Sequence, residues 1–176
     1  MPITIRRATP GDAAELHDVA ARTFGLACPP GTLQSDIDAF IAMHLSPAKF
    51  EEYVKDERRV LLLAEADGVA VGYAMLVAAP ITDEDVRRVV PDGSIELSKF
   101  YVLADSHGSG VARELMTATL AAAAETGATT CWLGVNQQNV RAAKFYDKCG
   151  FTVRGTKRFL VGDEWHDDHV RARSLP

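Results

Sequence analysis

The sequence predicts one mixed α/β (α+β) domain over residues 1–176, built around a central sheet. Three observations predict this fold class. Apolar, strand-like segments and helical segments follow one another along the chain with short turns between them. The dipeptide Asp67-Gly68 joins two apolar segments, which is typical of a tight antiparallel hairpin. A length of 176 residues allows one full core, and no linker or internal repeat divides the sequence.

Capping residues and apolar periodicity define the elements of the first half. Thr9 can cap the first helix, Pro10 fits its first position, and Asp12 completes a capping box. Ser46 and Pro47 give a later helix the same kind of start. In chain order we expect a strand over 3–6, a helix that is broken at 28–31, a helix over 33–45, a helix from 47, and hairpin strands over 60–66 and 69–78.

Glycines and alternating apolar residues divide the second half. Residues 81–93 are polar and contain Pro91, so we expect a mobile connection that could contact a substrate. The expected elements after it are a strand over 94–103, a helix over 110–126 that stops at Gly127, a strand over 129–135, a helix over 139–149 that stops at Gly150, and two strands over 151–160 and 165–173 joined by Gly162-Asp163.

Composition excludes several classes of protein. The formal net charge of −5 disfavours a nucleic-acid binder, which usually carries a basic face. The longest apolar stretches are strand-like, and the N-terminus has no signal core, so we expect no membrane segment and a cytoplasmic protein. Three widely spaced cysteines are typical of reduced thiols. His166 and His169 are three apart on an expected strand and face opposite sides, so we expect no metal.

The segment after the strand over 94–103 can bind a phosphate. His107, Gly108, Ser109 and Gly110 form a glycine-bearing turn that opens into a helix beginning with Val111-Ala112. The first N–H groups of a helix lack partners and the helix dipole adds positive charge, so such a junction suits a pyrophosphate. Taken alone, the segment is equally compatible with a plain glycine turn.

Two better-known phosphate motifs do not fit this turn. A P-loop needs Gly-Lys-Ser/Thr, which is absent here. A dinucleotide fingerprint needs a third glycine where Arg113 stands, and an acidic residue about 20 positions further on. Residues 128–136 contain no acidic residue. The turn therefore does not predict a nucleotide triphosphatase or a nicotinamide-dependent enzyme.

Two segments together resemble the GNAT superfamily of N-acetyltransferases. The turn is similar to its pattern Gln/Arg-x-x-Gly-x-Gly/Ala, with Gly110 and Ala112 in place and His107 departing from Gln or Arg. Residues 139–151 are similar to Asn-x-x-Ala-x-x-Phe-Tyr-x-Lys-x-Gly-Phe nearly residue for residue. The resemblance implies acetyl-CoA as co-substrate without a metal. It also implies a mostly antiparallel twisted sheet of about seven strands, helices on both faces, and a splayed parallel pair at the cofactor cleft.

The helix over 139–149 carries the expected acid. Acetyl transfer passes through a tetrahedral intermediate and expels a thiolate, which a nearby phenol can protonate. The resemblance implies this role for Tyr146, whereas the residue type alone fits a core aromatic better. Asn139 is seven residues earlier and shares its helix face. It can contact the pantetheine arm or substrate, and it can equally serve as the helix cap.

The resemblance also gives roles to the strand over 94–103. Its parallel neighbour would be residues 131–134, with the pantetheine between them. Backbone groups near Phe100 and Val102 would pair with the cofactor amides, and an N–H near Tyr101 or Val102 would contact the thioester carbonyl. Glu96 is the candidate to take a proton from the substrate ammonium. A salt-bridged or cation-binding carboxylate explains Glu96 equally well.

The acceptor substrate is the part of the predicted function that the sequence determines least. Residues 155–169 weakly resemble the tail of bacterial polyamine (spermidine/spermine) acetyltransferases, where the final hairpin lines the acceptor pocket. A small primary amine or polyamine is therefore the expected acceptor. A peptide or protein amine is the alternative, and a non-catalytic acyl-CoA-binding regulatory module is the competing class. Relatives commonly form dimers, so a homodimer is compatible with this reading.

Overall fold

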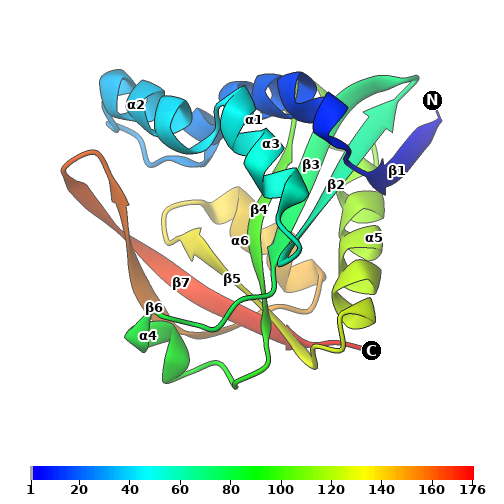
Figure 1. Cartoon of the computed structure of the whole chain (residues 1–176). Coiled ribbons are helices and arrows are strands. Elements are labelled where there is room, and N and C mark those ends of the chain that lie inside the picture. Colours follow the sequence, from blue (N-terminus) through cyan, green and yellow to red (C-terminus); the bar gives the residue numbers. More distant parts are fainter. Residues whose placement is uncertain (1) are drawn as a thin grey trace.

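Seven strands form one sheet in the computed structural model, which describes residues 2–176 (Figure 1). Their order across the sheet is β1-β2-β3-β4-β5-β7-β6. Neighbouring strands are antiparallel except for β4 and β5, which are parallel. The strands are β1 (Ile3–Arg7), β2 (Arg59–Ala66), β3 (Val69–Val77), β4 (Ile95–Val102), β5 (Thr130–Asn136), β6 (Thr152–Val161) and β7 (Glu164–Ser174).

Helices cover both faces of this sheet. The helices α1, α2 and α3 lie on one face and α5 on the other (Figure 1). The α-helices are α1 (Ala13–Ala27), α2 (Gln34–His44), α3 (Pro47–Lys55), α4 (Glu84–Arg87), α5 (Val111–Glu125) and α6 (Val140–Lys148), and short 3-10 helices cover Pro10–Asp12 and Ala104–Ser106. The predicted fold class, sheet type and helix placement are therefore confirmed, with element ends displaced by one or two residues.

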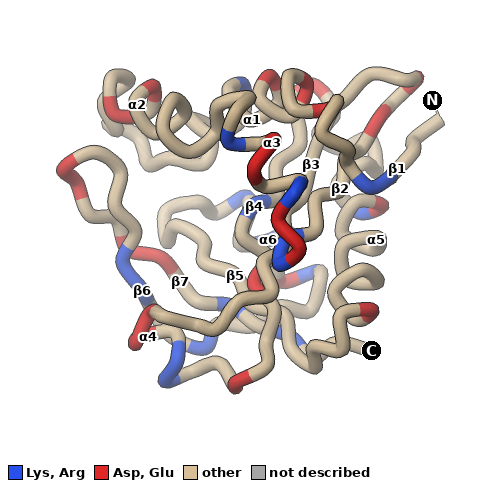
Figure 2. The backbone as a smooth tube through the Cα atoms, in the orientation of Figure 1, with Lys and Arg blue, Asp and Glu red and all other residues tan. Residues whose placement is uncertain are grey.

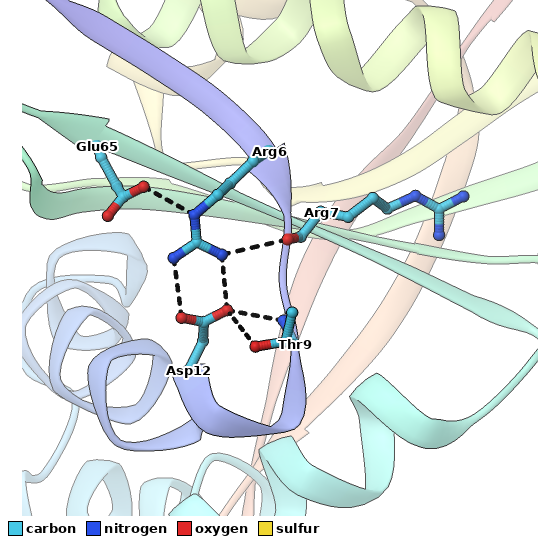
Figure 3. A network of polar contacts seen from close by, with 5 residues as sticks. All are labelled: Arg6, Arg7, Thr9, Asp12 and Glu65. Atoms are coloured by element: carbon cyan, nitrogen blue, oxygen red, sulfur yellow. Dashed lines mark hydrogen bonds and ion pairs between the residues drawn. The ribbon is translucent and has the colours of Figure 1, made fainter.

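A polar network fixes the first strand to the start of the first helix (Figure 3). Arg6 donates to both carboxylate oxygens of Asp12, at 2.8 and 2.9 Å, and through Nε to Glu65 on β2 at 2.8 Å. Asp12 also accepts the backbone N–H of Thr9 at 2.7 Å, as the predicted capping box requires. Hydrogen bonds from Arg6 hold the pKa of Asp12 well below its usual range.

The central hairpin has the tight turn that its sequence predicts. Asp67 and Gly68 both adopt positive φ angles, 51° and 79°, and Ala66 pairs directly with Val69. Such a turn matches the twist of the two strands that it joins. Behind the hairpin, the ring of Tyr73 packs edge-on against Phe50 of α3, with ring centroids 5.5 Å apart. This packing anchors the middle of the sheet beneath α3.

The segment over 81–93 differs from the expected irregular connection because it contains α4. The side chain of Asp83 accepts the backbone N–H groups of Asp85 and Val86, at 2.9 and 3.2 Å, and so caps this helix. Val86 is fully buried and packs in a small cluster with Trp132 of β5. The sequence signal for this helix is the N-cap aspartate Asp83, because four residues are too few to show a helical period.

Charged residues are spread over the molecule. In Figure 2, α2 carries acidic positions only, and β6 carries basic positions beside acidic ones on β7, so the basic residues do not gather into one face. This distribution agrees with the acidic net charge in disfavouring a nucleic-acid interface. Over residues 2–176, no helix is both long and apolar enough to span a bilayer.

Candidate active site

The strands β4 and β5 separate after only two paired positions. Ile95 pairs with Cys131 and Glu96 with Trp132, and the pairing ends there. Both strands nevertheless continue, β4 to Val102 and β5 to Asn136. A cavity of about 600 Å³ lies along the opening and is lined by residues 96–102 of β4 and 133–136 of β5. The splayed parallel pair predicted for the cofactor cleft is therefore present.

An extra residue in β4 accompanies this separation. On its other edge β4 stays paired with β3, where Met75 opposes Lys99 and Leu76 opposes Leu97, so Ser98 is the additional residue of a bulge. A bulge increases the local twist of its strand. Residues three apart in a regular strand face opposite sides, yet the charges of Glu96 and Lys99 shift each other's pKa and the charge of Arg59 acts on both. The bulge thus brings two charged side chains into one site.

Backbone groups of β4 face the opening. The N–H of Leu103 donates to Val71 of β3 at 2.8 Å. Because backbone groups alternate in direction along an antiparallel strand, those of Tyr101 also face β3, whereas those of Phe100 and Val102 face the gap toward β5. The side chain of Tyr101 lines the cavity and stacks on Tyr73, with ring centroids 5.8 Å apart.

His107 contacts the protein backbone in this structure. Its Nε2 lies 2.9 Å from the carbonyl oxygen of Val102, and because that oxygen can only accept, Nε2 carries the proton. Its Nδ1 is buried and has no hydrogen-bond partner within residues 2–176. The imidazole therefore connects the turn over 104–110 to the end of β4.

The start of α5 leaves backbone donors free. Gly108 and Gly110 have φ angles of 81° and 93°, and no atom of residues 2–176 outside the glycine and its two chain neighbours lies within 4 Å of where a Cβ would stand at either position. Gly110 is the N-cap of α5 and makes no side-chain capping bond. His107, Gly108 and Ala112 line the cavity, whereas Ser109, Gly110 and the fully buried Val111 are not among its lining residues. The first N–H groups of a helix lack partners within the helix, so the start of α5 can offer donors at this end of the cavity. Ser109 donates its hydroxyl to Ser106 at 2.5 Å, which tightens the turn.

The helix α6 places Asn139 and Tyr146 on the same cavity, as their spacing predicts. The side chain of Asn139 accepts the N–H of Ala142 at 3.2 Å, so the capping role is confirmed. Tyr146 is buried against Phe100 and Phe151, with ring centroids 6.4 and 5.9 Å away. Burial raises the pKa of its hydroxyl, which keeps the phenol protonated. Tyr146 is thus both a core aromatic and a cavity residue.

The charged end of the cavity involves three strands. Glu96 and Lys99 come from β4, Lys157 from β6 and Asp168 from β7. Lys157 Nζ lies 3.9 Å from Asp168 Oδ2. A Cβ at Gly134 would lie 3.2 Å from both of these side chains, so a glycine at this position on β5 gives them room.

Burial shifts the titration of these groups. It raises the pKa of Glu96, which Lys157 and Lys99 partly oppose. It lowers the pKa of Lys99 to about 8 and raises that of Asp168. Sequence reasoning identified Glu96 but missed Lys99, Lys157 and Asp168. The bulge that turns Lys99 inward leaves no sequence signal, whereas the period-2 alternation of the final hairpin could have placed Lys157 and Asp168.

A second, smaller cavity of about 190 Å³ adjoins this end. Residues 79–83 line it together with Trp132, Glu96 and Lys157. Glu96 and Lys157 therefore border both cavities, and part of the segment over 81–93 lies where a substrate could reach it. Within residues 2–176, no group of three or more histidine, cysteine or acidic side chains is arranged to hold a metal ion.

Comparisons with known proteins agree with this geometry. The model of the Acetyltransferase (GNAT) family matches residues 28–151. Uncharacterized N-acetyltransferases of Mycobacterium tuberculosis and Mycobacterium bovis are 47% identical over 164 residues, which cover 93% of this chain and 98% of theirs.

Solved structures share the fold at lower identity. The PaiA N-acetyltransferase of Thermoplasma acidophilum, in complex with coenzyme A, superposes with a TM-score of 0.82 at 21% identity, covering 99% of this chain and 100% of its own. YncA of Salmonella typhimurium, with its cofactor acetyl-CoA, superposes with a TM-score of 0.70 at 22% identity, covering 100% of this chain and 95% of its own.

Proposed function

The chain belongs to the GNAT family of acetyl-CoA-dependent N-acetyltransferases, and we propose that it transfers the acetyl group to a small primary amine by direct attack. The observation that carries this proposal is the opening between β4 and β5, with uncapped N–H groups of α5 at one end and charged side chains at the other. An elongated thioester with a pyrophosphate at its far end fits such a site.

In this proposal the cofactor lies along β4. The backbone over 108–112 binds the pyrophosphate, and the backbone groups of Phe100, which face the gap, pair with the pantetheine amides as an added strand would. The amide of Asn139 lies beside the same arm. Since the Val102 carbonyl already accepts from His107, the N–H of Val102 is the group left for the cofactor.

The reaction needs one base and one acid. Glu96 removes a proton from the substrate ammonium, directly or through water, and the neutral amine attacks the thioester carbonyl. The N–H of Val102 faces the gap and stabilises the developing oxyanion, whereas that of Tyr101 faces β3. Tyr146 then gives its proton to the departing thiolate, and the second proton lost by the attacking nitrogen restores the phenol. The acetyl group passes to nitrogen without an acyl-enzyme intermediate.

The acceptor class is tested by following thiol release from acetyl-CoA with polyamines, amino acids, aminoglycosides and peptides. We expect turnover with at least one class of small primary amine. Turnover with peptides alone would favour a peptide or protein acceptor. Saturable acetyl-CoA binding without thiol release from any class would contradict the proposal and favour the non-catalytic binding module.

A further inference from the structure

A lysine without an anionic partner lies in the charged end of the cavity. Lys99 lines the cavity beside Glu96. Within residues 2–176 its ammonium makes no hydrogen bond and no salt bridge. It lies near the ring of Tyr53, with Nζ 5.9 Å from the ring centroid. The ammonium is therefore available to a ligand.

The neighbouring cations already have carboxylate partners. Arg59 Nε lies 3.1 Å from Asp56 Oδ2, and Lys157 is paired with Asp168 at 3.9 Å. Burial lowers the pKa of the Lys99 ammonium to about 8; the charge of Glu96 opposes this shift, although Glu96 forms no salt bridge with Lys99. Arg141, an exposed residue of α6, also lines the cavity. At the charged end, the groups that remain after the paired ones are the carboxylate of Glu96 and the ammonium of Lys99.

The spacing of these two groups fits a short molecule. Residues three apart on an extended strand have Cα atoms about 10 Å apart. Glu96 and Lys99 both line the cavity and flank the bulge at Ser98. Their charged ends can therefore contact the two ends of one small ligand, with an ammonium at Glu96 and an anion at Lys99.

We propose that the acceptor is an amino carboxylate, whose amine reacts beside Glu96 and whose carboxylate binds Lys99. This inference rests on the proposed acetyl transfer and narrows its substrate. It also separates the chain from polyamine acetyltransferases, because a second ammonium on the acceptor would lie against Lys99. Like charges brought together in a partly desolvated site repel each other strongly.

Three acceptors of equal length test the proposal, namely 4-aminobutanoate, butylamine and 1,4-diaminobutane. They share the reacting amine and differ only at the far end, which is a carboxylate, a methyl group or an ammonium. Their kcat/KM values are measured with saturating acetyl-CoA, and the series is repeated one carbon shorter and one carbon longer. We expect the amino carboxylate to exceed both others by tenfold or more at its best length.

Variants at Lys99 assign this preference to one side chain. Lys99→Met should lower kcat/KM for the amino carboxylate about tenfold or more and leave butylamine within threefold, whereas Lys99→Arg should retain most of the preference. Lys55→Met, at an exposed lysine of α3, is the matched control and should change neither value. Thermal unfolding of each variant shows whether it is folded.

The outcomes separate this inference from the proposed function. Equal kcat/KM for butylamine and the amino carboxylates in the unmodified protein would overturn the inference alone, as would a preference that survives in folded Lys99→Met. A preference for the diamine would overturn it in favour of a polyamine acceptor. If acetyl-CoA binds but no acceptor is acetylated, the proposed function is overturned as well.

Discussion

The imidazole of His107 donates from Nε2 to the carbonyl oxygen of Val102 at 2.9 Å. This bond joins the turn before α5 to the last residue of β4. It therefore connects the backbone that we assign to the pyrophosphate with the backbone that we assign to the pantetheine. His107, which departs from the Gln or Arg of the family pattern, thus joins the two segments to which we assign the cofactor.

Replacing His107 should weaken cofactor binding more than catalysis. A net hydrogen bond contributes about 1 kcal/mol, so His107→Ala should raise the dissociation constant for acetyl-CoA about three- to tenfold and leave kcat within twofold. Calorimetric titration with acetyl-CoA measures the change. His17→Ala is the matched control, because His17 Nδ1 makes a similar 2.7 Å contact with the Leu45 carbonyl. If both variants lose the same affinity for acetyl-CoA, the role assigned to His107 is contradicted.

Removing the Tyr146 hydroxyl should slow the chemical step. Tyr146→Phe keeps the ring that packs on Phe100 and Phe151 and removes only the proposed acid. We expect kcat to fall about 100-fold while acetyl-CoA affinity stays within threefold. Steady-state rates and a binding titration measure the two quantities.

The control for Tyr146 is Tyr73→Phe. The Tyr73 hydroxyl is buried without a hydrogen-bond partner within residues 2–176, so its removal should leave activity unchanged and should not lower stability. Full activity in Tyr146→Phe would show that the general acid is another group.

Glu96 should determine how activity depends on pH. Burial raises the pKa of Glu96, so in the unmodified protein kcat/KM should begin to fall at a higher pH than an exposed glutamate would give. In Glu96→Gln we expect kcat/KM at pH 7 to fall about 100-fold. The remaining activity should then rise about tenfold per pH unit, because only the free amine reacts. If kcat/KM of the unmodified protein and of Glu96→Gln depends on pH in the same way, Glu96 is not the base.

The network of Arg6, Asp12 and Glu65 predicts a pH-dependent contribution to stability (Figure 3). Asp12→Asn should lower the free energy of unfolding at pH 7 by about 1–2 kcal/mol. The folded-state pKa of Asp12 is lowered. Its contribution is therefore complete above the ordinary aspartate pKa of about 4, and it is lost as the pH falls toward the folded-state value.

Urea unfolding of the protein and of Asp12→Asn at pH 7, 4 and 3 measures this effect. The difference between the two should shrink with acidification. Asp18→Asn is the control, because Asp18 is exposed and its 3.5 Å contact with Arg22 is a surface pair, which should contribute little. A difference that stays constant to pH 3 would contradict the role of the Asp12 charge.

Local signals predicted much of the fold. The Asp67-Gly68 turn, the Asn139 cap and the seven-residue spacing to Tyr146 depend on residues close in sequence, and all three are present as expected. The sheet type and the splayed pair followed from the family resemblance. The short helix α4 was missed, because four residues are too few to show a helical period.

The charged end of the site could not be predicted in the same way. Lys99 faces the cavity only because Ser98 is an extra residue in its strand, and pairing with β3 determines that bulge. Lys157 and Asp168 reach Glu96 only through the strand order β5-β7-β6. Alternation along the final hairpin can place Lys157 and Asp168 on one face, but their approach to Glu96 and the inward position of Lys99 depend on contacts between distant segments.

The central claim is direct transfer of the acetyl group to an amine within the opening between β4 and β5. A single-turnover experiment tests it most directly. Excess protein is loaded with acetyl-CoA, mixed with 4-aminobutanoate and other primary amines, and quenched for mass spectrometry of protein and small molecules. The account predicts one acetylated amine for each free coenzyme A and an unmodified protein at every time point. Acetyl-protein that forms before the product, or no acetylated amine at all, would contradict it.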